Sequence, residues 1–220
     1  MADSNANQLP NVRRSLQALA LLAILAGLAG CGDQARPAAP AKPRRAGAGI
    51  PASLLAAERP IGRGERFHPS VTGAVPGQCT PTLGPRIASH VELFGAGQVI
   101  LISAGVGTAP PRRSFAGRIT GARCFGSVVT LDPTGTVYSR PGRRLTLADL
   151  FSAWGQPLSD TRIGSFTGGP VRVYVDGRAQ PGSPLTVPLG AHAEIVLEVG
   201  PAVPPHRRFV FPPNPAPGTR

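Results

Sequence analysis

The sequence predicts a mainly β fold, either a β-sandwich or small β subdomains, with one short helix near residues 147–154. Two observations support this class. Beyond the first 77 residues, short apolar or alternating runs are separated by turns rich in glycine and proline, of which the chain has 28 and 26, as in all-β folds. Only one segment there shows a helical period, and strands do not alternate with helices as they do in α/β proteins.

The first expected strands form a β-hairpin at residues 89–103. In residues 89–94, apolar and polar side chains alternate, which indicates a half-buried strand. A glycine turn follows at 95–97. The continuous apolar run at 98–103 is typical of a buried strand.

The middle of the chain adds three strands. We expect a loop at residues 110–113 (PPRR), because proline cannot donate to a strand ladder. Residues 118–120 and 124–131 are short strands, and residues 136–139 form the return strand. The intervening 132–135 (DPTG) has proline second and glycine fourth, as a type I turn prefers.

Residues 147–154 carry the helical period. Their large apolar side chains recur at i, i+3, i+4 and i+7. Thr146 precedes them as N-cap, and Asp149 lies in the first turn, where the helix dipole favours an acidic group. Gly155 is a typical helix end. We expect the helix to bury its apolar face, with Trp154 as the core anchor.

The last third is again β. Residues 171–175 alternate cleanly, and Asp176-Gly177 follows as a hairpin signal. Residues 185–189 are the expected partner strand, placed at a sheet edge by their proline. Residues 195–199 form an apolar strand, and residues 209–211 are a candidate edge strand.

The N-terminal stretch predicts export. Arg13 and Arg14 precede an uncharged apolar run of sixteen residues, from Ser15 to Gly30. A membrane-spanning helix needs about 20 residues, whereas the apolar core of a signal peptide has about 7–15. The length therefore favours a signal peptide over a permanent anchor.

The end of this run resembles the lipobox of bacterial lipoproteins, with Leu28-Ala29-Gly30 placed before Cys31. The resemblance implies that the Cys31 thiol receives a diacylglyceryl group and becomes the N-terminus after cleavage. Stable anchoring takes two acyl chains or more, at about 0.8 kcal/mol per buried CH₂. The expected location is thus the extracytoplasmic face of the cell membrane, held by lipid. An ordinary secretory signal and an uncleaved anchor are the alternatives.

These features divide the chain into four parts. A signal peptide at 1–30 is followed, at 31–77, by the lipidated cysteine and a linker rich in proline, alanine and glycine. The mainly β domain is expected at 78–212. Residues 213–220 are expected to form a disordered tail, because they are rich in proline and polar residues.

Cysteine usage fits export. Of the three cysteines, Cys31 is assigned to lipid, and Cys79 and Cys124 remain as an even pair. In an oxidising compartment such a pair is a candidate disulfide. Two separate buried thiols are the alternative.

The formal net charge is +12, which suggests an anionic partner such as nucleic acid, lipid headgroups or wall polymer. Aromatic residues make up only 5% of the chain, so stacking platforms for nucleic acid are scarce, and export separates the chain from the nucleoid. We therefore expect no nucleic-acid partner. Anionic lipid headgroups or wall polymer are the candidates, unless most arginines simply form a solvated surface.

Residues 87–211 resemble a family of uncharacterised exported prokaryotic proteins. The most specific parts are the Asp132–Gly135 turn and the helix that ends in Trp154-Gly155. The resemblance rests on HVELFGAGQVILISAGVG at 90–107, SVVTLDPTGTVYS at 127–139, LTLADLFSAWGQPL at 145–158 and VRVYVDG at 171–177.

The family carries several histidines that this chain lacks. Histidines clustered on neighbouring strands suit a transition metal, but the matching positions here are Val129, Leu131 and Tyr138. Only His90 remains, and one imidazole is not a metal site. We therefore expect no metal and no cofactor, with Asp132 as a turn residue.

No catalytic motif is visible in the sequence. None of the four histidines stands in a His-Glu-x-x-His spacing, a Gly-x-Ser-x-Gly elbow is missing, and the 11 acidic residues are spread singly. His192 and His206 are expected at the surface. The sequence favours a non-enzymatic binding or structural module at the cell envelope. A degenerate member of a metal-binding family and a cell-wall hydrolase are the alternatives.

Overall fold

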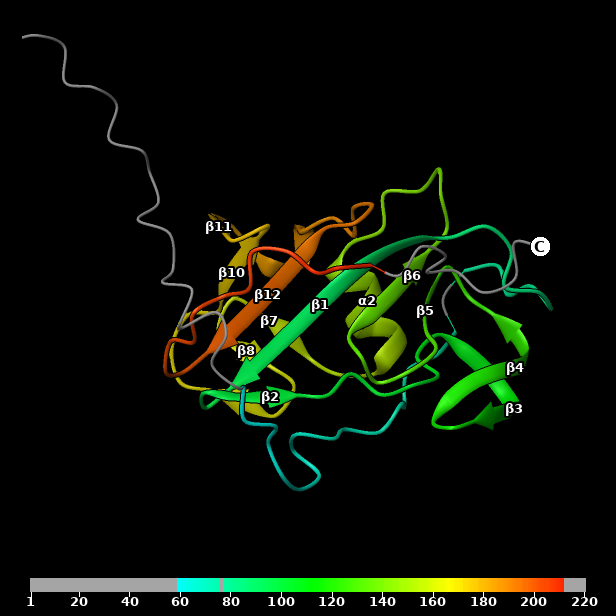
Figure 1. Cartoon of the computed structure of the whole chain (residues 1–220), viewed down its shortest axis with the longest axis horizontal. Helices are drawn as coiled ribbons and strands as arrows, with labels where there is room; N and C mark the ends of the chain where they lie inside the picture. Colours follow the sequence, from blue (N-terminus) through cyan, green and yellow to red (C-terminus); the bar gives the residue numbers. More distant parts are fainter. Residues whose placement is uncertain (1–58, 76, 212–220) are drawn as a thin grey trace, which may run out of the picture. The chain divides into compact units, whose positions relative to one another are not determined.

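The computed structural model describes residues 59–75 and 77–211, which all belong to one unit, Gly47–Arg220. They form a mainly β fold with one α-helix, as predicted (Figure 1). The expected signal peptide, Cys31 and the tail 213–220 lie outside the described residues. Within the described part, no helix combines the length and the apolar character needed to cross a membrane.

The centre of the fold is a seven-stranded sheet in the order β11-β10-β12-β1-β6-β5, with β2 paired to β1. β1 and β12 run parallel in its middle, and the other neighbours are antiparallel. Its strands are β1 (Ile87–Gly95), β2 (Gln98–Ile100), β5 (Val128–Thr130), β6 (Thr136–Ser139), β10 (Arg172–Val175), β11 (Arg178–Gln180) and β12 (Glu194–Val199).

Two hairpins form at glycine turns that the sequence predicts. Ala96-Gly97 joins β1 to β2, and Asp176-Gly177 joins β10 to β11. All four residues have positive φ, as the two central residues of a type I′ turn require. The tight second turn puts β11 directly beside β10, so the expected partner strand at 185–189 is wrong. A 3-10 helix, η1 (Pro184–Thr186), lies there instead.

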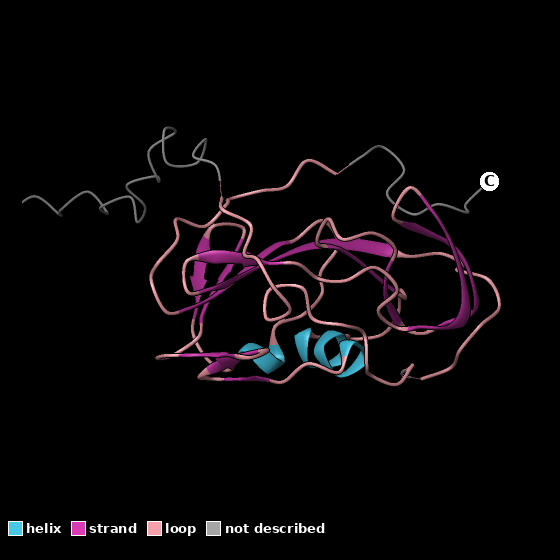
Figure 2. Cartoon of the chain, turned by 90° about the horizontal axis from the view of Figure 1, so that it is seen from below, coloured by secondary structure: helices cyan, strands magenta, loops and turns pink. Residues whose placement is uncertain are grey.

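Helix α2 (Leu147–Trp154) packs on one face of the sheet (Figure 2). At its start, the carboxylate of Asp149 accepts a hydrogen bond of 2.8 Å from the backbone N–H of Thr146. At its end, Gly155 has φ 78° and closes the helix in the left-handed conformation. Trp154 is 1% exposed and anchors the core, as predicted. The other buried helix residues are Leu147, Leu150, Phe151 and Ala153.

Two smaller sheets flank the main one. The first is three-stranded, with β7 (Leu158–Ser159), β8 (Arg162–Ile163) and β9 (Phe166–Thr167). The second is a two-stranded ribbon of β3 (Thr108–Phe115) and β4 (Arg118–Phe125).

The expected loop at residues 110–113 is wrong, because these residues belong to β3. A register shift between Ala109 and Arg112 lets the two prolines bulge out of the ladder. Proline is tolerated at such a bulge because it needs no ladder hydrogen bond there.

Residues 59–75, which the sequence analysis assigns to the linker 31–77, pack against the domain. The backbone N–H of Val99 donates to the carbonyl of Pro60 at 2.9 Å, and that of Leu101 donates to the carbonyl of Phe67 at 2.8 Å. The side chain of Phe67 also contacts the core beneath the sheet. The packed part of the chain therefore begins before residue 78.

Candidate functional site

The two central strands carry charged side chains on the sheet face that points away from helix α2. Side chains alternate along a strand, so Val91 and Leu93 point into the core with α2, and His90 and Glu92 point to the other face. On β12, Glu194 and Glu198 share that second face. The sheet is therefore apolar on one side and carries buried charged groups on the other.

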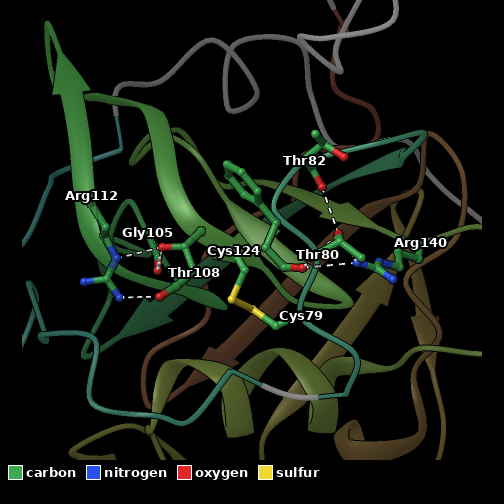
Figure 3. Close-up of a disulfide and its surroundings, with 9 residues drawn as sticks. Cys79, Thr80, Thr82, Gly105, Thr108, Arg112, Cys124 and Arg140 are labelled. Atoms are coloured by element: carbon green, nitrogen blue, oxygen red, sulfur yellow. Dashed lines mark hydrogen bonds between the residues drawn. A yellow bond between two sulfur atoms is a disulfide. The ribbon is translucent and has the colours of Figure 1, made fainter.

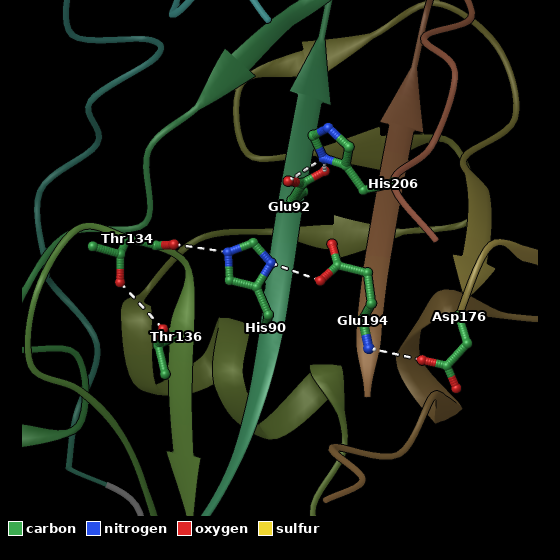
Figure 4. A network of polar contacts seen from close by, with 7 residues as sticks. All are labelled: His90, Glu92, Thr134, Thr136, Asp176, Glu194 and His206. Carbon is green, nitrogen blue, oxygen red and sulfur yellow. Dashed lines mark hydrogen bonds and ion pairs between the residues drawn. The ribbon is translucent and has the colours of Figure 1, made fainter. Parts of the chain in front are cut away.

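His90 and Glu194 are direct neighbours in the register of β1 and β12. Nδ1 of His90 lies 2.9 Å from Oε2 of Glu194, and Figure 4 shows the two side chains pointing toward each other. Both are buried, with exposed fractions of 6% and 1%. Nε2 of His90 lies 2.8 Å from the carbonyl oxygen of Thr134. Since a carbonyl only accepts, Nε2 must carry a proton and donate it.

The pKa of each group is raised above its ordinary value, but for different reasons. Burial raises the pKa of Glu194, and the hydrogen bond and charge of His90 offset this only in part. Burial lowers the pKa of His90, but the hydrogen bond and charge of Glu194, with the charge of Glu92 and the Thr134 carbonyl, raise it above 6.5 overall. Because the two groups contact each other directly, they titrate as a coupled pair.

The segment after β12, residues 203–211, here called the C-terminal segment, supplies the remaining groups of the site. Nδ1 of His206 lies 2.6 Å and 2.7 Å from the two carboxylate oxygens of Glu92. The ring of Phe209 stacks on His90, with centroids 3.8 Å apart and planes 5° apart. His206, expected at the surface, thus belongs to a polar cluster with His90, Glu92 and Glu194. The C-terminal segment covers this cluster through the ring of Phe209.

A hollow of about 340 Å³ lies beside these groups, and Arg208 and Val210 line it together with the cluster. Ligand atoms of His90, Glu92 and Glu194 all lie within 4.8 Å of one another. The hollow is roomy enough for an ion or several waters, since one water needs only about 10–15 Å³ of such volume. These three side chains are the described residues best placed to hold a metal.

The sequence analysis missed Glu92, Glu194 and His206 as members of a site. Val129, Leu131 and Tyr138, the positions that the sequence analysis aligned with the family's histidines, pack in an apolar cluster with Ala88. A different feature of the sequence could have revealed the site, namely the glutamates within apolar strands. A glutamate inside an otherwise apolar strand is rarely buried unless it has a partner. Strand β1 contains one glutamate, Glu92, and β12 contains two, Glu194 and Glu198.

Cys79 and Cys124 form the expected disulfide, with a Cα–Cα distance of 5.3 Å (Figure 3). Beside it, Thr80 pairs with Phe125: each backbone N–H donates to the other's carbonyl, at 3.0 Å and 2.7 Å. The bond ties the stretch before β1 to strand β4. It lies apart from the His90 cluster and plays no part in it.

The remaining predicted positions have structural roles. Asp132 is a turn residue, whose carboxylate pairs with Arg118 and accepts from Thr134. His192 is exposed and lies against the ring of Phe211, with centroids 4.9 Å apart. Residues 209–211 form no strand. The ring of Phe209 instead covers His90, and the ring of Phe211 lies beside His192.

The β3–β4 ribbon carries an exposed basic surface, here called the basic ribbon. Arg112, Arg113 and Arg123 are all exposed, and no ion pair of theirs is formed with another described residue. Phe115, near the turn that joins the strands, is 77% exposed. Positive charge beside an exposed aromatic ring suits contact with an anionic surface.

The His90 cluster and the basic ribbon are described from this structure alone, without reference to any relative. The resemblance of residues 87–211 to exported proteins stays a prediction. Comparisons with protein-family models, with curated proteins and with solved structures find no match to this chain.

Proposed function

We propose that the chain is an exported lipoprotein, anchored through Cys31 in the cell membrane, whose β domain acts on the extracytoplasmic face as a non-enzymatic binding or structural module. The Cys79–Cys124 disulfide carries this proposal. Disulfides persist in oxidising compartments and are rare in the cytosol. With those two cysteines joined, Cys31 is the one left over, and it stands directly after the apolar run.

The expected partner of the domain is an anionic surface of the envelope, either lipid headgroups or wall polymer. The basic ribbon supports this choice, because it presents three exposed arginines, Arg112, Arg113 and Arg123, on one two-stranded element. Each arginine near an anionic membrane contributes about 1 kcal/mol, and the attraction falls off within a Debye length. A lipid anchor on a linker would raise the effective concentration of the ribbon at such a surface.

A hydrolase is the less favoured function. Among the described residues, the buried carboxylate of Glu194 beside a hollow is the feature that suits a hydrolase best. Yet one oxygen of that carboxylate is held by His90, and the C-terminal segment covers the pair. A general acid or base must reach its substrate, so this arrangement favours binding over catalysis. Release of soluble fragments from purified wall material by the chain would contradict this choice.

The anchoring is tested by growing producing cells with an alkyne fatty acid. The wild-type chain should take up the label and sediment with membranes, and Cys31→Ser should lose both properties. The double variant Cys79→Ser/Cys124→Ser is the matched control, because it removes two cysteines but keeps the attachment point. Unlabelled wild-type protein recovered from the cytosol with its leader intact would overturn the proposal.

A further inference from the structure

Glu194 has a buried oxygen that nothing in the described part of the chain satisfies. Its side chain is 1% exposed, and Oε2 is taken by His90. Oε1 is buried without a hydrogen-bond partner among the described residues. In Figure 4 this oxygen lies on the side of Glu92 and His206. An unsatisfied buried carboxylate oxygen is costly, so a group that binds there would remove the penalty.

His90 is oriented as a metal-binding histidine is. Its Nε2 donates to the carbonyl oxygen of Thr134 at 2.8 Å, which leaves Nδ1 pointing toward the two glutamates. Metal-binding histidines almost always donate their other ring N–H to a carbonyl or carboxylate, which fixes the ring and its tautomer. The Thr134 carbonyl supplies that contact here without any change in the backbone.

We propose that His90, Glu92 and Glu194 bind one divalent transition-metal ion, through Nδ1 of His90 and one oxygen of each glutamate. Ligand atoms around a tetrahedral Zn²⁺ lie about 3.4 Å apart, and these three lie within 4.8 Å. Closing the site takes a shift of roughly 1 Å, which Glu92 can make because it is only partly buried.

The ligand set selects the class of ion. Imidazole suits Zn²⁺, Cu²⁺, Ni²⁺ and iron, whereas Mg²⁺ and Ca²⁺ take oxygen ligands almost exclusively. Two carboxylates balance the charge of a divalent ion. The fourth position opens onto the hollow beneath the C-terminal segment, where a water or the ring of His206 completes the coordination. His206 already contacts Glu92, so it also holds that carboxylate in place.

The inference goes beyond the proposed anchoring, because the three ligands lie within the domain and do not involve Cys31. It is tested on the full-length chain without a histidine tag, purified in detergent and stripped with a chelator. Titration with Zn²⁺ in a calorimeter should show one equivalent bound, and the melting temperature should rise with added Zn²⁺ because the ion binds the folded state. Ca²⁺ at the same concentrations should not displace the Zn²⁺.

Two variants and one control locate the site. Glu194→Gln should weaken Zn²⁺ binding at least about 100-fold, since loss of an outer partner alone costs 10- to 100-fold. Glu92→Gln should do the same, and it decides the test if Glu194→Gln does not fold. Glu198→Gln is the matched control: it lies on the same strand and the same face, is equally buried, and should keep the wild-type affinity.

Three results would overturn the proposal. They are a stripped wild-type chain that binds no stoichiometric Zn²⁺, a folded Glu92→Gln variant that binds it as well as the wild type does, and displacement of the Zn²⁺ by Ca²⁺. None of these results bears on fatty-acid labelling of Cys31, so the two proposals fail separately.

Discussion

Arg172 and Glu198 pair across strands β10 and β12, with Nη2 of the arginine 3.1 Å from Oε2 of the glutamate. Glu198 is fully buried, and its Oε1 has no hydrogen-bond partner among the described residues. Burial raises the pKa of Glu198 above 4.5, and hydrogen bonds from the Val203 backbone and Arg172 oppose this only in part. The folded state therefore holds the Glu198 proton more tightly than the unfolded chain does.

This pairing makes a prediction about pH. A raised folded pKa contributes stability that is fully present below pH 4.5 and is lost as the pH rises through the folded value. Glutamine cannot ionise, so the free energy of unfolding of Glu198→Gln, measured relative to that of the wild type, should increase as the pH rises from 4 to 7. Urea unfolding of both chains across this range measures the difference, with Glu65→Gln, at an exposed position, as control. Parallel pH profiles for wild type and Glu198→Gln would show that the carboxyl does not titrate as inferred.

Removal of the Cys79–Cys124 disulfide should destabilise the domain. The bond closes a loop with a sequence separation of 45, for which the chain-entropy model gives about 4 kcal/mol. The double variant Cys79→Ser/Cys124→Ser should melt at a lower temperature than wild type, and wild type treated with a reductant should melt with it. If the reductant leaves the melting temperature of the wild type unchanged, the disulfide contributes nothing.

The basic ribbon should bind anionic vesicles. The triple variant Arg112→Gln/Arg113→Gln/Arg123→Gln loses three exposed charges, at about 1 kcal/mol each, so its vesicle affinity should fall by about 100-fold at low salt. The measurement is co-sedimentation with vesicles that contain phosphatidylglycerol, in a Cys31→Ser background that removes the proposed anchor. Raising the salt should reduce wild-type binding.

A charge-matched variant separates a local effect from a general one. Arg63, Arg144 and Arg178 are also exposed but lie outside the ribbon, and their replacement by glutamine lowers the net charge equally. This variant should bind vesicles nearly as well as the wild type. An equal loss in both triple variants would mean that total charge, rather than the ribbon, draws the domain to the surface.

Two glycines make opposite predictions for alanine. Gly107 has φ +64°, and a Cβ there would lie 1.8 Å from the backbone oxygen of Val128. At Gly117, φ is +77°, and no atom lies within 4 Å of such a Cβ. Gly117→Ala should cost only the left-handed strain, about 1–2 kcal/mol, and Gly107→Ala should cost clearly more. Chemical unfolding of both variants provides the comparison, and equal losses would contradict the close approach of β5.

Local patterns predicted the local structure. The two-residue turns at 96–97 and 176–177 and the caps of α2 each depend on a few adjacent residues, so a single sequence reveals them. The two prolines of β3 led to the wrong prediction of a loop. A β-bulge removes the need for their ladder hydrogen bonds, and no local sequence pattern indicates such a bulge. The prediction of a strand at residues 185–189 was also wrong, because the tight turn at 176–177 pairs β10 with β11 instead.

The candidate site could not be predicted, because it depends on contacts between segments that are far apart in the sequence. Its members come from β1, β12 and the C-terminal segment, and His206 is 114 residues away from Glu92. Nothing local states that β1 pairs in parallel with β12. The position of the glutamates within apolar strands did indicate buried partners, although it did not say which ones.

The parallel contact between β1 and β12 also sets the order in which the protein can fold. His90 meets Glu194 only after more than a hundred intervening residues have been made. Until then β1 has an unpaired edge, and the sheet cannot close as the chain emerges from the ribosome. Contacts of such long range slow folding and leave strand edges open to aggregation. The chain therefore has to stay protected until β12, the last strand in the described part of the chain, is available.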